Sequence, residues 1–149
     1  MPRFPRRLLF AADGSTESDV AREAVVDLVA GSPECEVHVV HVVLESAWTN
    51  SKTLGPQQVE RMRQEGQEVL DGQVAALQVA GVRSTSTHVA LGRTVDEVLR
   101  LRDTVDADLI VIGSRGRNAF MRVLLGSDAE SVVKHAPCSV LVARSRNSA

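Results

Sequence analysis

Short apolar runs of strand length recur along the chain and alternate with segments that have helical spacing. Four are continuous runs rich in β-branched residues or Leu, bounded by polar or turn residues, and they cover residues 8–12, 37–44, 109–112 and 140–143. Such runs are typical of strands covered on both faces, as in a parallel sheet. Residues 84–91 alternate more between polar and apolar positions, which predicts a fifth strand nearer a sheet edge.

The segments between the strands have apolar residues three and four positions apart, which indicates helices. The first predicted helix begins at a cap formed by Ser15 or Thr16 and ends at Gly31. The second ends at Gly81, and its apolar face has gaps at Gly66 and Gln73. The apolar faces comprise Val20, Ala24, Val25 and Leu28 in the first helix and Val59, Met62, Val69, Val74, Leu77 and Ala80 in the second.

Two further helices complete the pattern. The third is predicted to begin with a capping box formed by Thr94 and Glu97. The last has an apolar face of Ala129, Val132, Val133 and Ala136 and stops at Pro137. Strands and helices therefore alternate from a first strand to a fifth. This order predicts a single α/β domain over residues 1–149, a three-layer sandwich around a five-stranded parallel sheet.

Composition narrows the possible functions. The chain has 149 residues, 44% of them hydrophobic and 24% charged, and a net charge of −2, so no basic field favours nucleic acid as a partner. Cys35 and Cys138 lie far apart with no CxxC pairing, which argues against a zinc site or a disulfide framework. The apolar stretch after the basic start is too short for a signal peptide or a membrane span, so we expect a cytoplasmic protein that does not bind membranes.

A glycine-rich segment carries the clearest chemical signal. Gly113 and Gly116 follow the most apolar strand, and Gly126-Ser127 opens the last helix. Glycine suits positions where the backbone takes a positive φ or approaches a ligand closely, and a helix start offers amides to an anion. The spacing predicts a phosphate-binding loop, although tight strand-to-helix turns also use glycine. Arg115 lies within this loop and either approaches the ligand or stays on the surface, whereas Arg117 and Arg122 are expected on a solvated face.

Asp13 follows the first strand, where ligands bind in open α/β sheets. Its carboxylate is expected to bind a ribose hydroxyl or to reach Mg²⁺ through water; the alternative is a turn-forming Asp-Gly pair. His38 and His41 point to opposite faces of their strand, and we interpret all four histidines as structural. The spacing of the chain's Ser, His, Cys and Asp residues matches no catalytic or metal-ligating arrangement, and the GxxxxGK[ST] pattern is absent.

Taken together, these segments resemble the universal stress protein family over nearly the whole chain. The resemblance rests on LLFAADGSTES, VHVVHVV, DADLIVIGSRG and LLGSDAESVVKHAPCSVLVAR, in this order. The last two segments carry the Gly-x2-Gly-x9-Gly-Ser signature of the family's ATP-binding branch. The resemblance implies an adenine nucleotide alpha-hydrolase-like (Rossmann-like) fold with strand order 3-2-1-4-5, in which the first and fourth strands are neighbours.

The resemblance also implies a nucleotide site. The adenine pocket would be lined by the backbone near Ala11 and Ala12 and by Val42, while Asp13 would meet the ribose or the metal-bound phosphates. Ribose and phosphate would be held by Ile112, Gly113, Arg115 and Gly116, and the phosphate tail would be capped by Gly126, Ser127, Asp128 and Ala129. The ligand would be ATP with Mg²⁺. Asp128 and Ala129 depart from the small or hydroxylic residues that are common there, which leaves ADP or AMP as alternatives.

The expected function is that of a regulatory ATP-binding protein of the stress response. We expect little or no turnover, at most weak ATP hydrolysis, and no catalytic residues. The resemblance implies a homodimer that forms through the last strand, residues 139–143. A slow ATPase and a nucleotide-free interaction scaffold are the two alternatives.

Overall fold

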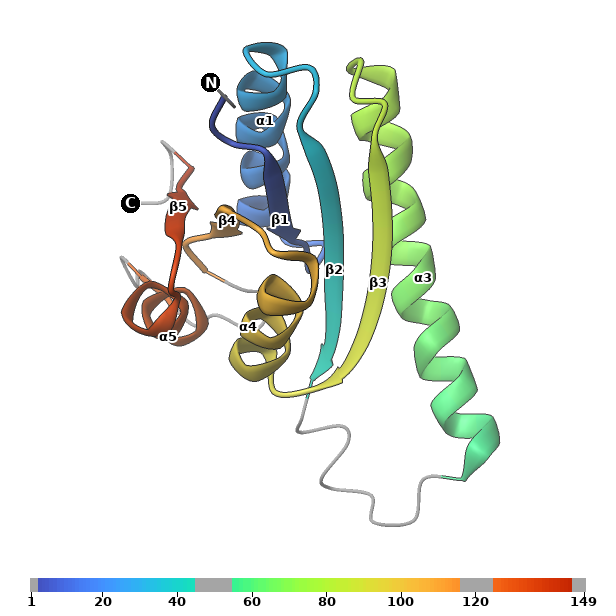
Figure 1. Ribbon diagram of the computed structural model, residues 1–149. Helices are drawn as coiled ribbons and strands as arrows, with labels where there is room; N and C mark the ends of the chain where they lie inside the picture. Colours follow the sequence, from blue (N-terminus) through green and yellow to red (C-terminus); the bar gives the residue numbers. More distant parts are fainter. Residues whose placement is uncertain (1–2, 45–54, 116–124, 146–149) are drawn as a thin grey trace.

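The computed structural model describes residues 3–44, 55–115 and 125–145, and a five-stranded parallel sheet forms its centre (Figure 1). The strand order is β3-β2-β1-β4-β5, which confirms the predicted order. The strands are β1 (Arg7–Ala11), β2 (Glu36–Leu44), β3 (Thr85–Gly92), β4 (Leu109–Gly113) and β5 (Ser139–Ala143), and the helices are α1 (Thr16–Ala30), α3 (Pro56–Val79), α4 (Thr94–Val105) and α5 (Ser127–His135).

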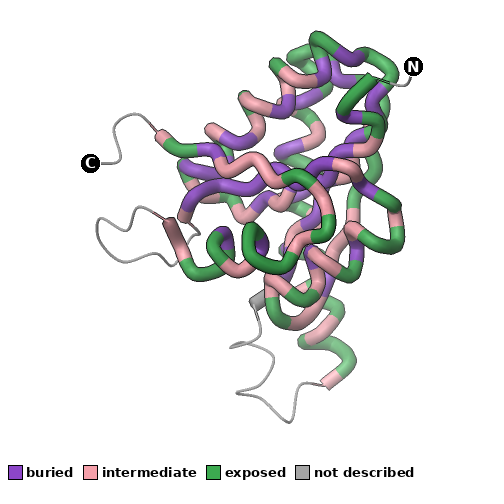
Figure 2. Tube along the Cα trace, turned by 60° about the vertical axis from the view of Figure 1, so that its left-hand side comes forward, coloured by how far each residue is buried: buried purple, intermediate pink, exposed green. Residues whose placement is uncertain are grey.

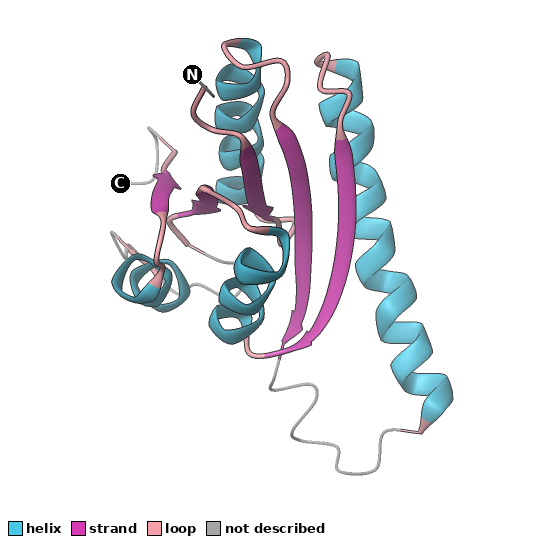
Figure 3. Cartoon of the chain, in the orientation of Figure 1, coloured by secondary structure: helices cyan, strands magenta, loops and turns pink. Residues whose placement is uncertain are grey.

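Helices cover both faces of this sheet, so the three-layer prediction is confirmed (Figure 3). On one face, Leu8 and Phe10 pack in a core cluster with residues of α1 and α3. On the other face, Leu9 packs in a cluster with residues of α4 and α5. Successive side chains of β1 thus enter opposite layers, which explains why its sequence is continuously apolar. The buried segments run through the middle of the molecule (Figure 2).

Helix α1 begins at Ser15, whose side chain accepts a hydrogen bond from the amide of Ser18 at 3.1 Å. This contact decides between the two predicted caps. The helix ends at Gly31 as expected. Of the predicted apolar face only Val25 is fully buried, because the helix turns Ala21 and Val29 inward and also buries two polar residues of its first turn, Glu17 and Ser18.

The buried face of α3 differs from the one predicted from the sequence. The predicted gaps, Gly66 and Gln73, are buried together with Leu70 and Leu77, whereas Ala80 is exposed. A Cβ on Gly66 would lie 3.0 Å from a methyl carbon of Val89, so the glycine lets the helix approach β3 closely. The buried side chain of Gln73 accepts a hydrogen bond from Arg22 at 3.0 Å, which compensates for its burial.

The start of α4 also differs from the prediction. Arg93 is the N-cap, Thr94 is the first helical residue, and no side chain caps the helix, so the expected capping box is not formed. The side chain of Glu97 instead binds Arg100. The reason is that β3 ends with Gly92 at a φ of 144°, which starts the helix one residue earlier than the pattern suggested.

The last helix follows the prediction at both ends. It runs from Ser127 to His135 with Ala136 as its C-cap, directly before Pro137. Ala129 and Val132 are buried, but Val133, which was placed on the apolar face, is 48% exposed. None of the helices in the described ranges combines the length and apolar character that a membrane crossing requires.

Candidate functional site

The predicted site residues lie at the carboxyl edge of the sheet, where β1 and β4 are neighbours. Ala11 pairs with Ile112 in the ladder, so the chain continues from both strands at the same edge, into Asp13 on one side and Ser114 on the other. From β1 the chain enters α1 on one face, and α5, which follows β4 in the chain, covers the opposite face. This is the switch point at which open α/β sheets bind ligands.

Gly113 at the end of β4 is required for packing. A Cβ at this position would lie 2.9 Å from both the carbonyl carbon and the carbonyl oxygen of Glu17. Backbone atoms cannot move aside as a flexible side chain can, so only glycine lets the first turn of α1 lie against β4. The need for glycine at 113 therefore has a structural cause within the protein itself.

Glu17, which the sequence analysis did not single out, is the buried carboxylate at this edge. Its side chain is 7% exposed. It accepts hydrogen bonds from the amide of Ser145 at 2.8 Å, from the guanidinium of Arg115 at 3.0 Å and from the hydroxyl of Ser114 at 3.3 Å. We call these four residues the Glu17 cluster. It ties the start of α1 to the chain leaving β4 and to the chain leaving β5.

These contacts also fix the charge of Glu17. Burial alone would raise its pKa, but the hydrogen bonds from Ser145, Arg115 and Ser114 outweigh burial and hold the pKa below its usual value. One signal in the sequence could have identified this residue. Glu17 lies four positions before Ala21 and eight before Val25, on the same stripe of α1 that is buried.

Arg115, predicted to approach a ligand or stay on the surface, pairs with Glu17 and is 20% exposed. Gly116, Arg117 and Arg122 lie outside the described residues. The structure therefore describes only the two ends of the predicted phosphate-binding loop, residues 113–115 and 125–129.

The second end of the loop is the start of α5. Gly126 is the N-cap and, as a glycine, supplies no side-chain hydrogen bond to the helix, and the amide of Gly126 donates to the carbonyl oxygen of Ser114. Gly126 has a φ of −67°, so glycine is not needed here for a positive φ. Ser127 and Asp128 are exposed and Ala129 is buried. A helix start offers amides to an anion, and a glycine at the N-cap has no side chain that competes for them.

Asp13 and Asp128 face each other across this edge. Partial loss of solvent first, and then the Asp13 carboxylate, raise the pKa of Asp128, while Arg93 lowers it. Asp13 also forms the turn that the sequence suggested, because its Oδ1 accepts from the amide of Ser15 at 2.9 Å. Two charged side chains from separate segments, Asp13 and Arg93, thus act on Asp128 at the mouth of the site.

The residues expected to contact adenine divide between the two core clusters. Ala11, Val42 and Ile112 belong to the cluster on the α4–α5 face, whereas Ala12 belongs to the α1–α3 face. The backbone of Ala12 is engaged within the protein, since its amide donates to Val40 at 2.8 Å and its carbonyl oxygen lies 2.8 Å from Nδ1 of His41. Ala11, Val42 and Ile112 therefore form an apolar patch on the side where α5 begins.

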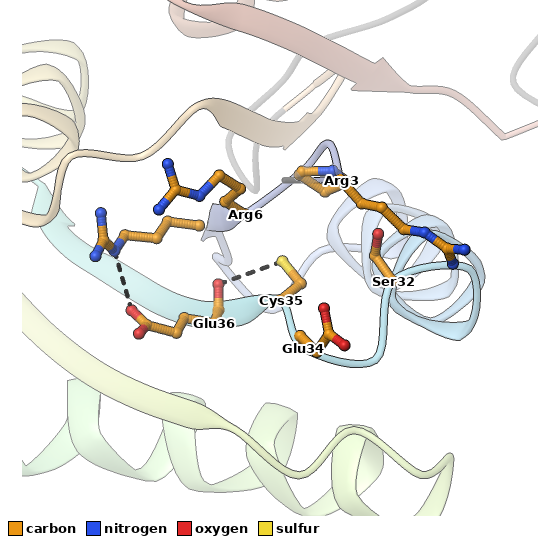
Figure 4. Close-up of a pocket in the computed structure, with 8 residues that line it drawn as sticks. Arg3, Arg6, Ser32, Glu34, Cys35 and Glu36 are labelled. Carbon is orange, nitrogen blue, oxygen red and sulfur yellow. Dashed lines mark hydrogen bonds and ion pairs between the residues drawn. The ribbon is translucent and has the colours of Figure 1, made fainter. Parts of the chain in front are cut away.

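A pocket of about 180 Å³ lies at the opposite end of the sheet, beside the first residues of β1 and β2 (Figure 4). Its lining includes Arg3, Arg6, Ser32 and the buried Cys35. Burial first, and then the nearby Asp108 carboxylate, raise the pKa of Cys35 to about 11, so the thiol stays protonated and unreactive. This pocket contains none of the predicted site residues.

Solved structures with the same architecture cover almost the whole chain. The protein MJ0577 superimposes with a TM-score of 0.84 at 21% identity, over 97% of this chain and 99% of that one. A universal stress protein solved with cAMP gives 0.70 at 21% identity, over 94% and 97%. One from Arabidopsis thaliana solved with AMP gives 0.68 at 21% identity, over 96% and 94%. These likenesses support the adenine nucleotide alpha-hydrolase-like fold.

Sequence comparison gives the family directly. A Staphylococcus aureus (strain USA300) protein that is named as a universal stress protein is 32% identical over 140 residues, which cover 93% of this chain and 84% of the relative. The Universal stress protein family profile matches residues 5–144, from the start of the first strand to the end of the last. The chain belongs to the universal stress protein family.

Proposed function

We propose that this chain binds an adenine nucleotide, MgATP foremost, at the carboxyl edge of β1 and β4, and acts as a regulatory member of its family with little or no turnover. The proposal rests on one observation. The end of β1, the end of β4 and the start of α5, whose N-cap is Gly126, meet at a single switch point. The relatives solved with cAMP and AMP support an adenine nucleotide as the ligand class.

The apolar patch of Ala11, Val42 and Ile112 is suited to a purine base. These side chains lie on the same face as α5, whose first amides would reach the phosphates of a nucleotide based there. Asp13 would meet the ribose hydroxyls, and Gly113, Arg115 and Gly116 would follow the phosphate chain. Gly126, Ser127, Asp128 and Ala129 would close the site.

The charges at the mouth of the site bear on the number of phosphates. Partial desolvation first, and then the Asp13 carboxylate, raise the pKa of Asp128, and both carboxylates would repel a bare triphosphate. Carboxylate oxygens are the ligands that Mg²⁺ prefers, so a magnesium complex of ATP fits these residues, with Asp13 reaching the ion through water. AMP, which brings less charge, is the alternative ligand that this pair of carboxylates favours.

The state of Glu17 supports the proposal of low turnover, because it removes one candidate for the general base. A general base for water attack needs a pKa near neutrality. The pKa of Glu17 is held low, and its oxygens accept three hydrogen bonds within the protein. We therefore expect phosphate release from MgATP to stay close to the rate of the uncatalysed control over hours.

The experiment has two steps. Denaturing the purified chain and chromatographing the supernatant detects nucleotide that was carried through purification. The nucleotide-free chain is then heated with MgATP, ATP plus EDTA, AMP or adenosine. A ligand at a hundred times its Kd adds about 2.7 kcal/mol, a shift of several degrees for a domain of this size. No shift with any of these ligands at millimolar concentration would refute the proposal.

We also propose that the chain forms a homodimer through β5. This strand is at the edge of the sheet, and its central residues Val140, Leu141 and Val142 are only half-buried in the single chain. An edge of small and aliphatic residues without charge favours pairing with a second copy. Light scattering at micromolar concentration should give twice the chain mass, and Val140→Pro should reduce it; a monomeric parent chain would contradict the proposal.

A further inference from the structure

Two histidines that the nucleotide site does not use meet on the sheet. His38 lies near the start of β2 and His88 in the first half of β3. The register pairs His88 with Val40, two residues after His38, so both side chains point to the same face. Nδ1 of His38 lies 3.1 Å from Nε2 of His88, and the ring centroids are 5.3 Å apart.

The residues around His38 and His88 favour neutral imidazole rings, whose nitrogen lone pairs can bind a ligand. Burial first, and then the nearby His38, lower the pKa of His88, which favours the neutral ring. The other ring nitrogen of His38, Nε2, lies 3.8 Å from Oε2 of Glu36, a carboxylate that Arg7 holds at 3.2 Å. A carboxylate on this side favours the proton on Nε2 and leaves the Nδ1 lone pair directed at His88.

The separation of the two nitrogens suits a shared metal ion. Ligand nitrogens about 2.0–2.1 Å from one ion are about 2.9 Å apart at a right angle and about 3.4 Å apart at the tetrahedral angle. The observed 3.1 Å lies between these values. An N–H···N hydrogen bond has the same length, but its proton lies on the line between the two nitrogens, whereas a shared ion lies beside that line and requires both lone pairs to turn toward it.

We propose that His38 and His88 form a binding site for one divalent transition-metal ion of the Zn²⁺ and Cu²⁺ class. Imidazole nitrogens are suitable ligands for both ions. Within residues 3–44, 55–115 and 125–145, no group of three or more His, Cys, Asp or Glu side chains could hold a metal, so water completes the coordination. Glu36 acts as a positioning residue through His38. The site lies in the amino-terminal halves of β2 and β3, away from the nucleotide edge.

Calorimetric titration of ZnCl₂ into the tag-free, metal-free chain tests this proposal. We expect one ion per chain and a loss of affinity of at least tenfold in both His38→Gln and His88→Gln. Glu36→Gln should weaken binding by about tenfold, because an outer carboxylate orients its histidine. His135→Gln is the matched control, since His135 is exposed on α5 and bonds only to Ser131 in the described structure. This control should bind like the parent.

Electron paramagnetic resonance of the parent chain with one equivalent of Cu²⁺ gives a second readout that needs no variant. Coupling to two imidazole nitrogens is expected, and it should disappear in His88→Gln after circular dichroism has shown that this variant folds. No Zn²⁺ binding at millimolar metal would overturn the proposal. Binding that both histidine variants retain, or a copper spectrum without nitrogen coupling, would equally show that the pair is only a hydrogen bond.

Discussion

Helices α1 and α5 both have acids in their first turns, but Glu17 and Asp128 are in opposite electrostatic situations. Each helix start lies at the carboxyl edge of the sheet, with Glu17 in α1 and Asp128 in α5. Glu17 is buried, and three hydrogen-bond donors hold its pKa low. Asp128 is exposed on the surface, yet its pKa is raised by partial desolvation and by Asp13.

The difference shows that, at one edge of the sheet, the start of α1 contributes to stability whereas the start of α5 is suited to binding. At the start of α1 the donors come from the protein itself, from the ends of β4 and β5, so the carboxylate is part of the folded framework. At the start of α5 the N-cap is a glycine without a side chain, and the Asp13 carboxylate repels Asp128. Charge that the protein leaves uncompensated at a helix start is available for a ligand. Four substitutions test this division.

Glu17→Ala should have the largest effect. It removes the acceptor of Arg115, Ser114 and Ser145, and breaking a buried ion pair by deleting one partner costs about 3–5 kcal/mol. Urea unfolding measures the change. Glu23→Ala, at an exposed position of the same helix, is the control and should stay within about 0.5 kcal/mol of the parent.

The pH dependence of the free energy of unfolding is a second test of Glu17, and its direction can be predicted. Because the pKa of Glu17 is lowered in the folded state, its contribution is fully present above the pKa of the unfolded chain and is lost as the pH falls through the folded value. The stability difference between the parent and Glu17→Ala should therefore shrink in acid. A difference that is independent of pH would mean that the charge of Glu17 does not matter.

Gly113→Ala should have the next largest effect, again on the free energy of unfolding. The new methyl group would meet the backbone of Glu17 at 2.9 Å, and overpacking of this kind typically costs about 1–3 kcal/mol. Gly72→Ala in α3 is the matched control, because no atom lies within 4 Å of its Cβ position. In a helix interior that change should stabilise by about 0.5–1 kcal/mol. Equal costs at the two positions would refute the packing argument.

Gly126→Val should act on binding rather than on folding. A φ of −67° is open to valine, so the fold should persist, while the side chain would occupy space in front of the α5 amides. We expect at least about a tenfold loss of MgATP affinity, or about 1.4 kcal/mol, and a smaller loss for adenosine. Titration calorimetry after circular dichroism measures both. A folded variant that binds ATP like the parent would place the phosphates elsewhere.

Asp128→Asn should have the smallest effect, a few tenths of a kcal/mol in stability, with the sign opposite to that of Glu17. Because the pKa of Asp128 is raised in the folded state, its charge costs stability at neutral pH, and the cost disappears as the pH falls below the pKa of the unfolded chain. The variant should be slightly more stable at neutral pH and should bind ATP more tightly relative to adenosine. Equal changes in affinity for the two ligands would contradict the electrostatic argument.

Much of the fold could be predicted because it depends on local patterns. Continuous apolar runs located the strands, and Ser15, Gly31 and Pro137 located helix ends, since each acts on its own few residues. The strand order came from the family resemblance and is confirmed. The buried faces of the long helices were harder to predict from the sequence. Gly66 and Gln73 look like defects in an apolar stripe, yet the structure buries both because β3 and α1 supply their neighbours.

The sequence by itself determined the five strands and four helices of the described residues and the glycines that mark both ends of the predicted loop. Only the tertiary structure decided which first-turn acid is structural. The partners of Glu17 lie 97, 98 and 128 residues away in sequence, in segments that become neighbours only when β4 and β5 join the sheet. Burial and pKa depend on such distant contacts, so two acids that look alike in the sequence acquire opposite properties in the fold.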